Sequence, residues 1–244
     1  MLFGSESIST YTKGNIVVWM ILAFQAGLLN IGGLMAAHTF VSHVTGYATL
    51  FGLEVGRGDY LHALGFLMVP GFFLFGSMVS GILVDLRLAQ NKKPKYYVVF
   101  GLLFLLILAL VVLGFNNYFG KFGDSVNDTR DYTLIALLCM ICGIQNGMVT
   151  LVSRSVVRTT HLTGVTTDLG IGLIRVLNRN KLKGRIDGEG QANLMRVGII
   201  VFFVWGSVVG MRLFHEWGYR GFLFPTVISG GLFFTTLYFQ VLRD

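Results

Sequence analysis

The chain has 244 residues, of which 54% are hydrophobic and only 13% are charged, and its mean hydropathy is +0.69. Soluble globular domains carry roughly 25% charged residues, so this composition excludes a soluble protein and predicts an integral membrane protein whose main partner is the lipid bilayer. The net charge of +7 comes from Lys and Arg residues between apolar segments. That distribution is typical of membrane topology signals and argues against nucleic-acid binding.

Six segments are apolar and long enough to cross a bilayer, which needs about 20 mostly apolar residues. In chain order they are residues 16–37, 61–84, 96–115, 132–153, 194–215 and 221–242. We expect the first to be a retained helix, because it is too long for a signal peptide and lacks a basic start. The pattern predicts an all-α polytopic membrane protein with six transmembrane helices as a minimum.

The two halves of the chain contain the same motifs in the same order. AGLLN at Ala26–Asn30 corresponds to CGIQN at Cys142–Asn146, and each is followed by an H-x-T-G motif, at His43–Gly46 and at His161–Gly164. Further along, Gly52 and Gly170 lie at the same distance from their motifs. Such self-similarity in a fixed order indicates an internal repeat.

A second pair of blocks extends this repeat into the following spans, where FFLFGSMVSG at residues 72–81 matches FFVWGSVVGM at residues 202–211. The third span of each half matches only in being apolar. We therefore predict a first membrane repeat over residues 1–115, an external loop over 116–131 and a second membrane repeat over 132–244.

Residues 38–58 and 158–177 are either full spans or re-entrant half-helices, since each begins polar and continues as a short apolar stretch containing an acid, Glu54 or Asp168. If both re-enter, fourteen of the 19 Lys and Arg residues lie on one side and five on the other, as expected for a cytoplasmic face. Both termini are then cytoplasmic. Three full spans per repeat is an odd number, which predicts two inverted three-helix repeats, as in many secondary transporters.

The re-entrant tips would meet near the middle of the membrane, where irregular backbone must be buried in protein or line a cavity. In each H-x-T-G motif the Thr can cap the next helix and the Gly permits a tight approach. Two helix N-termini facing one cavity suit an anion or carboxylate, although the motif also fits a purely structural turn. The candidate substrate-binding residues are Asn30, His43, Thr45, Gly46, Gln145, Asn146, Arg158, His161, Thr163 and Gly164.

Asp168 is the candidate coupling residue, because an ionisable group at membrane depth is costly to bury. It would take up a proton, coordinate Na⁺, or form a structural ion pair with Arg154, Arg158 or Arg175. Glu54 is expected nearer the outer surface and solvated.

The other candidates also have two interpretations each. The histidines fit proton relay or a hydrogen bond to a backbone carbonyl. The amides, including Gln25, fit substrate binding or hydrogen bonds between helices. Arg158 fits lipid headgroup contact or capture of an anion. Cys139 and Cys142 fit small residues packed against a neighbouring helix better than a metal or redox site.

No enzyme, metal or cofactor motif is present in the sequence. The blocks around Gly27–Gly52 and Gly143–Gly170, above all GIQNGMVTLVSRSVVRTTHLTGVTTDLG, resemble the YoaK-like family of uncharacterised bacterial inner-membrane proteins. This resemblance covers nearly the whole chain and implies a fold and a location rather than an activity. Members tend to have Asp where this chain has Asn30, and T-G-N where it has Thr45–Tyr47.

These features lead to the hypothesis of a small secondary transporter for a solute or ion, possessing no cofactor and working by alternating access. A channel, or a membrane scaffold or sensor that transports nothing, is the alternative. The sequence leaves open whether the chain forms a homo-oligomer.

Overall fold

The computed structural model describes residues 13–124, 129–152, 162–181 and 188–243, and this part of the chain folds into helices with no strand. Short π-helical or 3-10 turns follow α3, α7, α8 and α9, at Gly81–Asp85, Arg179–Lys181, Gly218–Phe222 and Tyr238–Leu242. The helices are α1 (Lys13–Ala37), α2 (Val44–Arg57), α3 (Tyr60–Ser80), α4 (Leu86–Ala89), α5 (Tyr96–Phe115), α6 (Thr129–Val152), α7 (Leu162–Leu177), α8 (Glu189–Trp217) and α9 (Leu223–Leu237).

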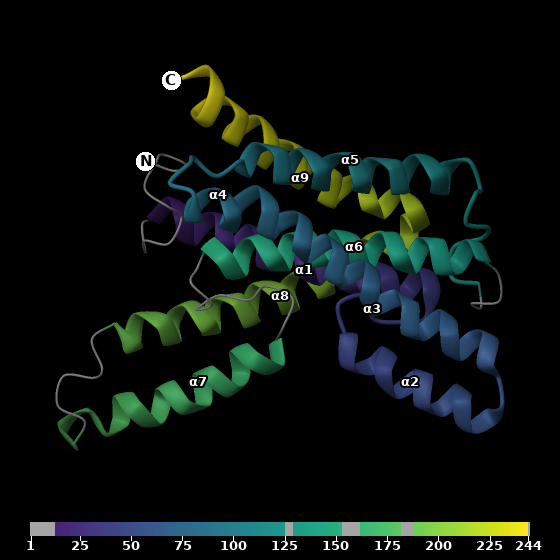
Figure 1. Cartoon of the computed structure of the whole chain (residues 1–244), viewed down its shortest axis with the longest axis horizontal. Coiled ribbons are helices and arrows are strands. Elements are labelled where there is room, and N and C mark those ends of the chain that lie inside the picture. Colours follow the sequence, from purple (N-terminus) through teal and green to yellow (C-terminus); the bar gives the residue numbers. More distant parts are fainter. Residues whose placement is uncertain (1–12, 125–128, 153–161, 182–187, 244) are drawn as a thin grey trace.

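Five helical runs among the described residues are long and apolar enough to cross a membrane. Four of them coincide closely with predicted spans. The fifth, Glu189–Leu242, is 54 residues long and contains both α8 and α9. Figure 1 shows α8 and α9 as separate helices running in opposite directions. The fold is thus an all-helical, membrane-like one, and the number of six spans stays a prediction.

The long helices pack in pairs drawn from different halves of the chain. α1 packs mainly on α8, α6 packs mainly on α3, and α5 packs on α9. Figure 1 shows these helices lying roughly along the long axis of the molecule. The two remaining helices stay within their own half, because α2 packs on α3 and α7 on α8.

Glycines let the paired backbones touch. A Cβ added to Gly27 of α1 would overlap the carbonyl oxygen of Phe203 on α8, and one added to Gly206 of α8 would overlap that of Phe24 on α1. Ser207 completes this contact by donating a hydrogen bond to the Gly27 carbonyl at 3.4 Å. Without hydrophobic drive between helices in lipid, such close approach of small residues is a main source of association.

The α3–α6 pair repeats this contact with the corresponding residues. A Cβ on Gly143 of α6 would overlap the Phe73 carbonyl of α3, and one on Gly76 of α3 would overlap the Met140 carbonyl. Ser77 donates to the Gly143 carbonyl at 3.2 Å, as Ser207 does to that of Gly27. Residues matched in the two sequence blocks therefore make matching contacts.

The third helices, α5 and α9, also meet through corresponding residues. Gly101 lies under the ring of Phe233, Gly230 lies under the ring of Phe104, and the two rings stack with centroids 6.4 Å apart. The sequences around them, GLLF at 101–104 and GGLF at 230–233, match as well, so the third spans share more than an apolar character. The correspondence between the halves thus extends to all three long helices.

α2 and α7 are the shortest of the helices that carry the repeated motifs. With 14 and 16 residues they measure about 21 and 24 Å, less than the roughly 30 Å hydrocarbon core of a bilayer. In Figure 1 both begin near the middle of the molecule, and they run toward opposite ends of its long axis. Because both helices begin near the middle of the molecule, the two motifs at their starts lie close together.

Candidate functional site

A cavity of about 710 Å³ lies at the beginning of α2 and α7. Its volume falls within the roughly 300–1,000 Å³ of small-molecule sites. Both of these short helices contribute to it, together with α1, α3, α6 and α8. The described residues that line it are Asn30, Phe40, Ser42, His43, Val44, Thr45, Pro70, Phe73, Leu74, Ser77, Asn146, Leu162, Thr163 and Phe203.

Several lining residues are corresponding members of the two halves. Asn30 and Asn146 come from the first blocks, Thr45 and Thr163 from the two H-x-T-G motifs, and Phe73 and Phe203 from the second blocks. The sequence predicted that the motif tips meet at one cavity, and both threonines do line this one. The two phenylalanines were not singled out as site residues, although their repeated FF pairs carried the signal.

The connection from α1 to α2 is fixed at two points. His38 adopts a positive φ of 51°, and its Nε2 lies 2.8 Å from the carbonyl oxygen of Gly123. The Ser42 hydroxyl donates to Oδ1 of Asn30 at 3.0 Å. These bonds hold the chain so that α2 starts at the cavity wall.

The positive end of α2 faces the cavity. His43 is the N-cap of α2 and makes no side-chain capping bond. Thr45 was expected to cap the helix, but it lies inside the first turn, where its carbonyl oxygen accepts a bond from Thr49 at 3.1 Å. In α7 the carbonyl oxygen of Thr163 accepts from Thr167 in the same way, at 2.9 Å. The two helix starts therefore have matching local structure, and the dipole of each favours a negative charge nearby.

The two asparagines of the cavity differ in their bonding. Oδ1 of Asn30 accepts the bond from Ser42, whereas Oδ1 of Asn146 is buried and has no hydrogen-bond partner. Buried polar atoms in native proteins are nearly always bonded, so an unbonded one calls for an explanation. A bound solute that donates a hydrogen bond would satisfy Asn146.

Charged side chains are absent from the described lining, in which only His43 can titrate. Asp168 lies on α7, partly buried and outside the lining residues. Its expected partner Arg175 instead bonds Glu189 at 3.3 Å, while Arg154 and Arg158 lie outside the described residues. Among the described residues, the features of the cavity wall that favour a negative charge are therefore the starts of α2 and α7.

Glu54 is not solvated as expected. Its side chain is only 14% exposed and pairs with Arg57 at 2.9 Å, one turn further along α2. The expectation was wrong because the i, i+3 spacing brings the two side chains onto the same face of α2.

Gln145 lies in a separate, fully buried network. It accepts a bond from Gln25 at 2.9 Å and donates to the carbonyl oxygen of Leu22 at 2.9 Å. Ser229 of α9 in turn donates to Gln25 at 3.1 Å. Of the two interpretations of this amide, the geometry supports the connection between helices, here α1, α6 and α9.

The remaining candidates are placed as follows. Gly46 lies against the His43 ring, since a Cβ there would come within 2.9 Å of Nδ1. Gly164 is in the first turn of α7 and does not line the cavity. Arg158 and His161 lie outside the described residues. Cys139 and Cys142 are free and buried, and Cys139 donates to the Val41 carbonyl at 3.0 Å.

Comparison with protein families gives one finding. A family described as "Protein of unknown function (DUF1275)" matches residues 18–235. The chain belongs to this family. The part of the chain that matches the family includes both H-x-T-G motifs and every described residue that lines the cavity. No curated protein and no solved structure matches the chain.

Proposed function

We propose that this chain is a small secondary transporter of the bacterial inner membrane, which moves a small solute by alternating access between two inverted repeats. The observation that carries the proposal is the shared cavity. Corresponding residues of the two halves, Asn30 with Asn146 and Thr45 with Thr163, line one space. A central site at the interface of two repeats is what secondary transporters use.

The architecture we propose is six transmembrane helices and two re-entrant half-helices, α2 and α7. Their lengths of 14 and 16 residues support re-entry, as do their opposite directions away from the middle of the molecule in Figure 1. α8 and α9 would be two spans, since the 3-10 turn at Gly218–Phe222 lies between them. The repeats would comprise residues 1–115 and 132–244.

The charge distribution supports an orientation with both termini in the cytoplasm. In Figure 1 the start of α1, the connection between α4 and α5, the end of α7 and the C-terminus lie toward one end of the long axis. That end contains Lys92, Lys93, Lys95, Arg175 and Arg243 among its described basic residues. Cytoplasmic loops carry such an excess of Lys and Arg.

For the solute, the cavity favours a small molecule with a carboxylate or other anionic group and a hydrogen-bond donor. The starts of α2 and α7 would attract the negative group, and Asn146 would accept from the donor. Asp168, on α7 beyond the cavity wall, is proposed as the site that couples transport to a proton or Na⁺. Within its family, we propose that the chain belongs with the YoaK-like inner-membrane proteins that its motifs resemble.

Labelling of single introduced cysteines tests the topology. Arg57→Cys at the end of α2 and Lys181→Cys beyond α7 should react with an impermeant maleimide from opposite faces of the membrane. The native cysteines are buried and provide a low background. Reaction of both introduced cysteines from the same side would refute the inverted arrangement.

Transport is tested in proteoliposomes with a panel of small carboxylates and inorganic anions. A transporter should show saturable uptake and counterflow, and Asp168→Asn should weaken uptake and abolish its dependence on the pH or Na⁺ gradient. Thr163→Ile, which fills the cavity, should reduce uptake, with Thr167→Ile as the matched control outside the lining. Flux without counterflow would indicate a channel instead, and no flux of any solute would indicate a scaffold or sensor.

A further inference from the structure

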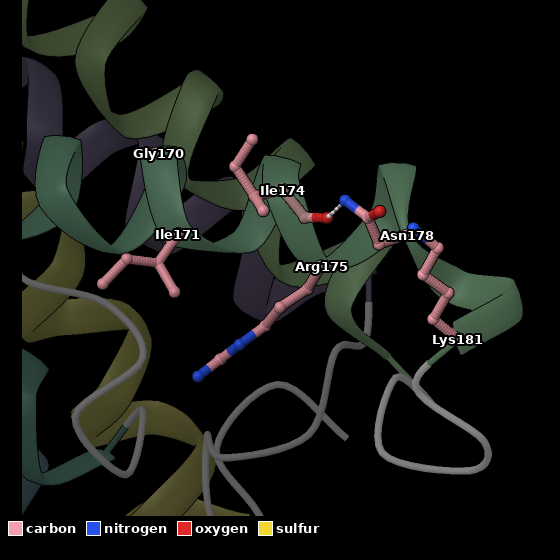
Figure 2. A pocket seen from close by; sticks show the side chains of 6 residues that line it. All are labelled: Gly170, Ile171, Ile174, Arg175, Asn178 and Lys181. Carbon is pink, nitrogen blue, oxygen red and sulfur yellow. Dashed lines mark hydrogen bonds between the residues drawn. The ribbon is translucent and has the colours of Figure 1, made fainter.

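A second hollow, of about 640 Å³, lies along the later turns of α7, beyond the first-turn residues Leu162 and Thr163 that line the cavity. It is lined by Gly170, Ile171, Ile174, Arg175, Asn178 and Lys181, which recur at helical spacing and share one side of the helix. Figure 2 shows that Arg175 extends away from α7, while the Asn178 amide turns back onto the Ile174 carbonyl. The surface is therefore apolar along the helix and basic at its C-terminal end.

The apolar part of this surface has no packing partner among the described residues. α7 packs on α8 through its other side, where Val165 and Gly172 are buried. Ile171 is 49% exposed and Ile174 is 61% exposed. In a membrane protein such side chains are covered by acyl chains.

The basic part carries an excess of positive charge. Arg175 and Lys181 line the hollow, Arg179 lies between them in the chain, and all three are exposed. Arg175 pairs with Glu189, which accepts from it at 3.3 Å and also accepts from the largely buried Arg196 at 2.7 Å. One carboxylate thus serves two guanidinium groups, and the two other cations have no acid in the described lining of the hollow.

The corresponding end of α2 has the opposite balance. There Arg57 is paired with Glu54, and Asp59 adds a second acid that bonds His62. The two helices are similar in other respects, since they have 14 and 16 residues and each has a Thr–Thr hydrogen bond in its first turn, so of the two only α7 has a basic end. A helix of this kind therefore forms without a basic end, as α2 shows.

We propose that this face of α7 is a binding site for an anionic phospholipid. Arg179 and Lys181, with the exposed guanidinium of Arg175, would bind the phosphate, and Ile171 and Ile174 would contact the first carbons of an acyl chain. Basic residues beside an apolar helix face attract anionic lipids in this way. The site is separate from the cavity and does not depend on transport.

Binding can be measured on the purified full-length chain in a neutral detergent, by titrating short-chain phosphatidylglycerol or phosphatidylcholine and following the melting temperature. Phosphatidylglycerol should bind more tightly. The double variant Arg179→Gln/Lys181→Gln should lower the affinity for phosphatidylglycerol about 25-fold, since each basic residue near an anionic lipid raises the affinity about fivefold. Arg57→Gln, at the end of α2, is the matched control and should leave binding unchanged.

Ile174→Ser tests the apolar contact. It should weaken phosphatidylglycerol binding without altering the melting temperature of the lipid-free protein. Inorganic phosphate alone should not displace the lipid. Equal affinity for the two lipids, an equal loss in Arg57→Gln, or displacement by inorganic phosphate would each overturn the proposal.

Discussion

Adding a methyl group to Gly27 or Gly143 should separate two helices that touch through their backbones. In Gly27→Ala the new Cβ overlaps the Phe203 carbonyl oxygen and lies 2.9 Å from the amide nitrogen of Ser207. Both are main-chain atoms of α8, so a side-chain rotation cannot relieve the overlap. In Gly143→Ala the Cβ meets the backbone of Phe73 on α3 in the same way.

Two other matched glycines isolate the effect. Nothing lies within 4 Å of a Cβ added at Gly52 or Gly170, so alanine there brings only its higher helix propensity, about 1 kcal/mol. At Gly27 and Gly143 the same gain is opposed by overpacking, which costs typically 1–3 kcal/mol. We expect Gly27→Ala and Gly143→Ala to be less stable than Gly52→Ala and Gly170→Ala by about 1–3 kcal/mol.

Thermal unfolding of the four variants in one detergent measures this difference. A difference of 1–3 kcal/mol corresponds to roughly 2–12 °C in melting temperature for a chain of this size. The two tight positions should also shift by similar amounts, because their contacts correspond. If all four variants melt together, or if only one tight position is sensitive, the matched backbone contacts do not stabilise the fold as argued.

Three further predictions concern residues outside the glycine contacts. Gln145→Leu should cost about 1–3 kcal/mol because it strands a buried donor, and adding Gln25→Leu should cost less than the sum of the single losses in a double-mutant cycle of melting temperatures. Cys139 and Cys142, at 1% and 0% exposure, should react with maleimide only after denaturation; labelling of the folded protein would contradict their burial. Asp59 caps α3 by accepting a hydrogen bond from the backbone amide of His62, and this bond holds the pKa of Asp59 below the usual 3.8. The capping bond should therefore stabilise the fold fully above pH 3.8. This stabilisation should be lost as the pH falls through the lower pKa that Asp59 has in the folded protein. The melting temperature of Asp59→Ala should therefore lie below that of the parent at neutral pH and converge with it in acid.

Much of the fold could be predicted from the sequence, because apolar length and repeated motifs are strong local signals. The segments 96–115 and 132–153 match α5 and α6 closely. The pairing of α1 with α8 and of α6 with α3 could not be predicted. It depends on which glycines meet which carbonyls, and small residues indicate a close contact without naming its partner.

The candidate site was predicted in part. The H-x-T-G motifs led to Thr45 and Thr163 because a repeated turn expected at membrane depth must be buried in protein or line a cavity. Gln145 was chosen with Asn146 because both are amides, yet neighbouring residues on a helix point 100° apart, and only Asn146 lines the cavity. Pro70 was missed, since a single proline in an apolar span carries no sign of which side it faces.

The places where the two halves differ are as informative as those where they match. Pro70 lines the cavity in the first half, and the position equivalent to it in the second half is Ile200. Proline removes a hydrogen bond inside α3, so α3 is easier to bend at the cavity than α8. In the transporter proposed above, two repeats with equivalent contacts would give two conformations of nearly equal free energy, and residues that break the equivalence would determine which of them is favoured. Pro70 and the Gln25–Gln145 bond, which joins α1 to α6, are differences of this kind, one beside the cavity and the other in the buried core between the halves.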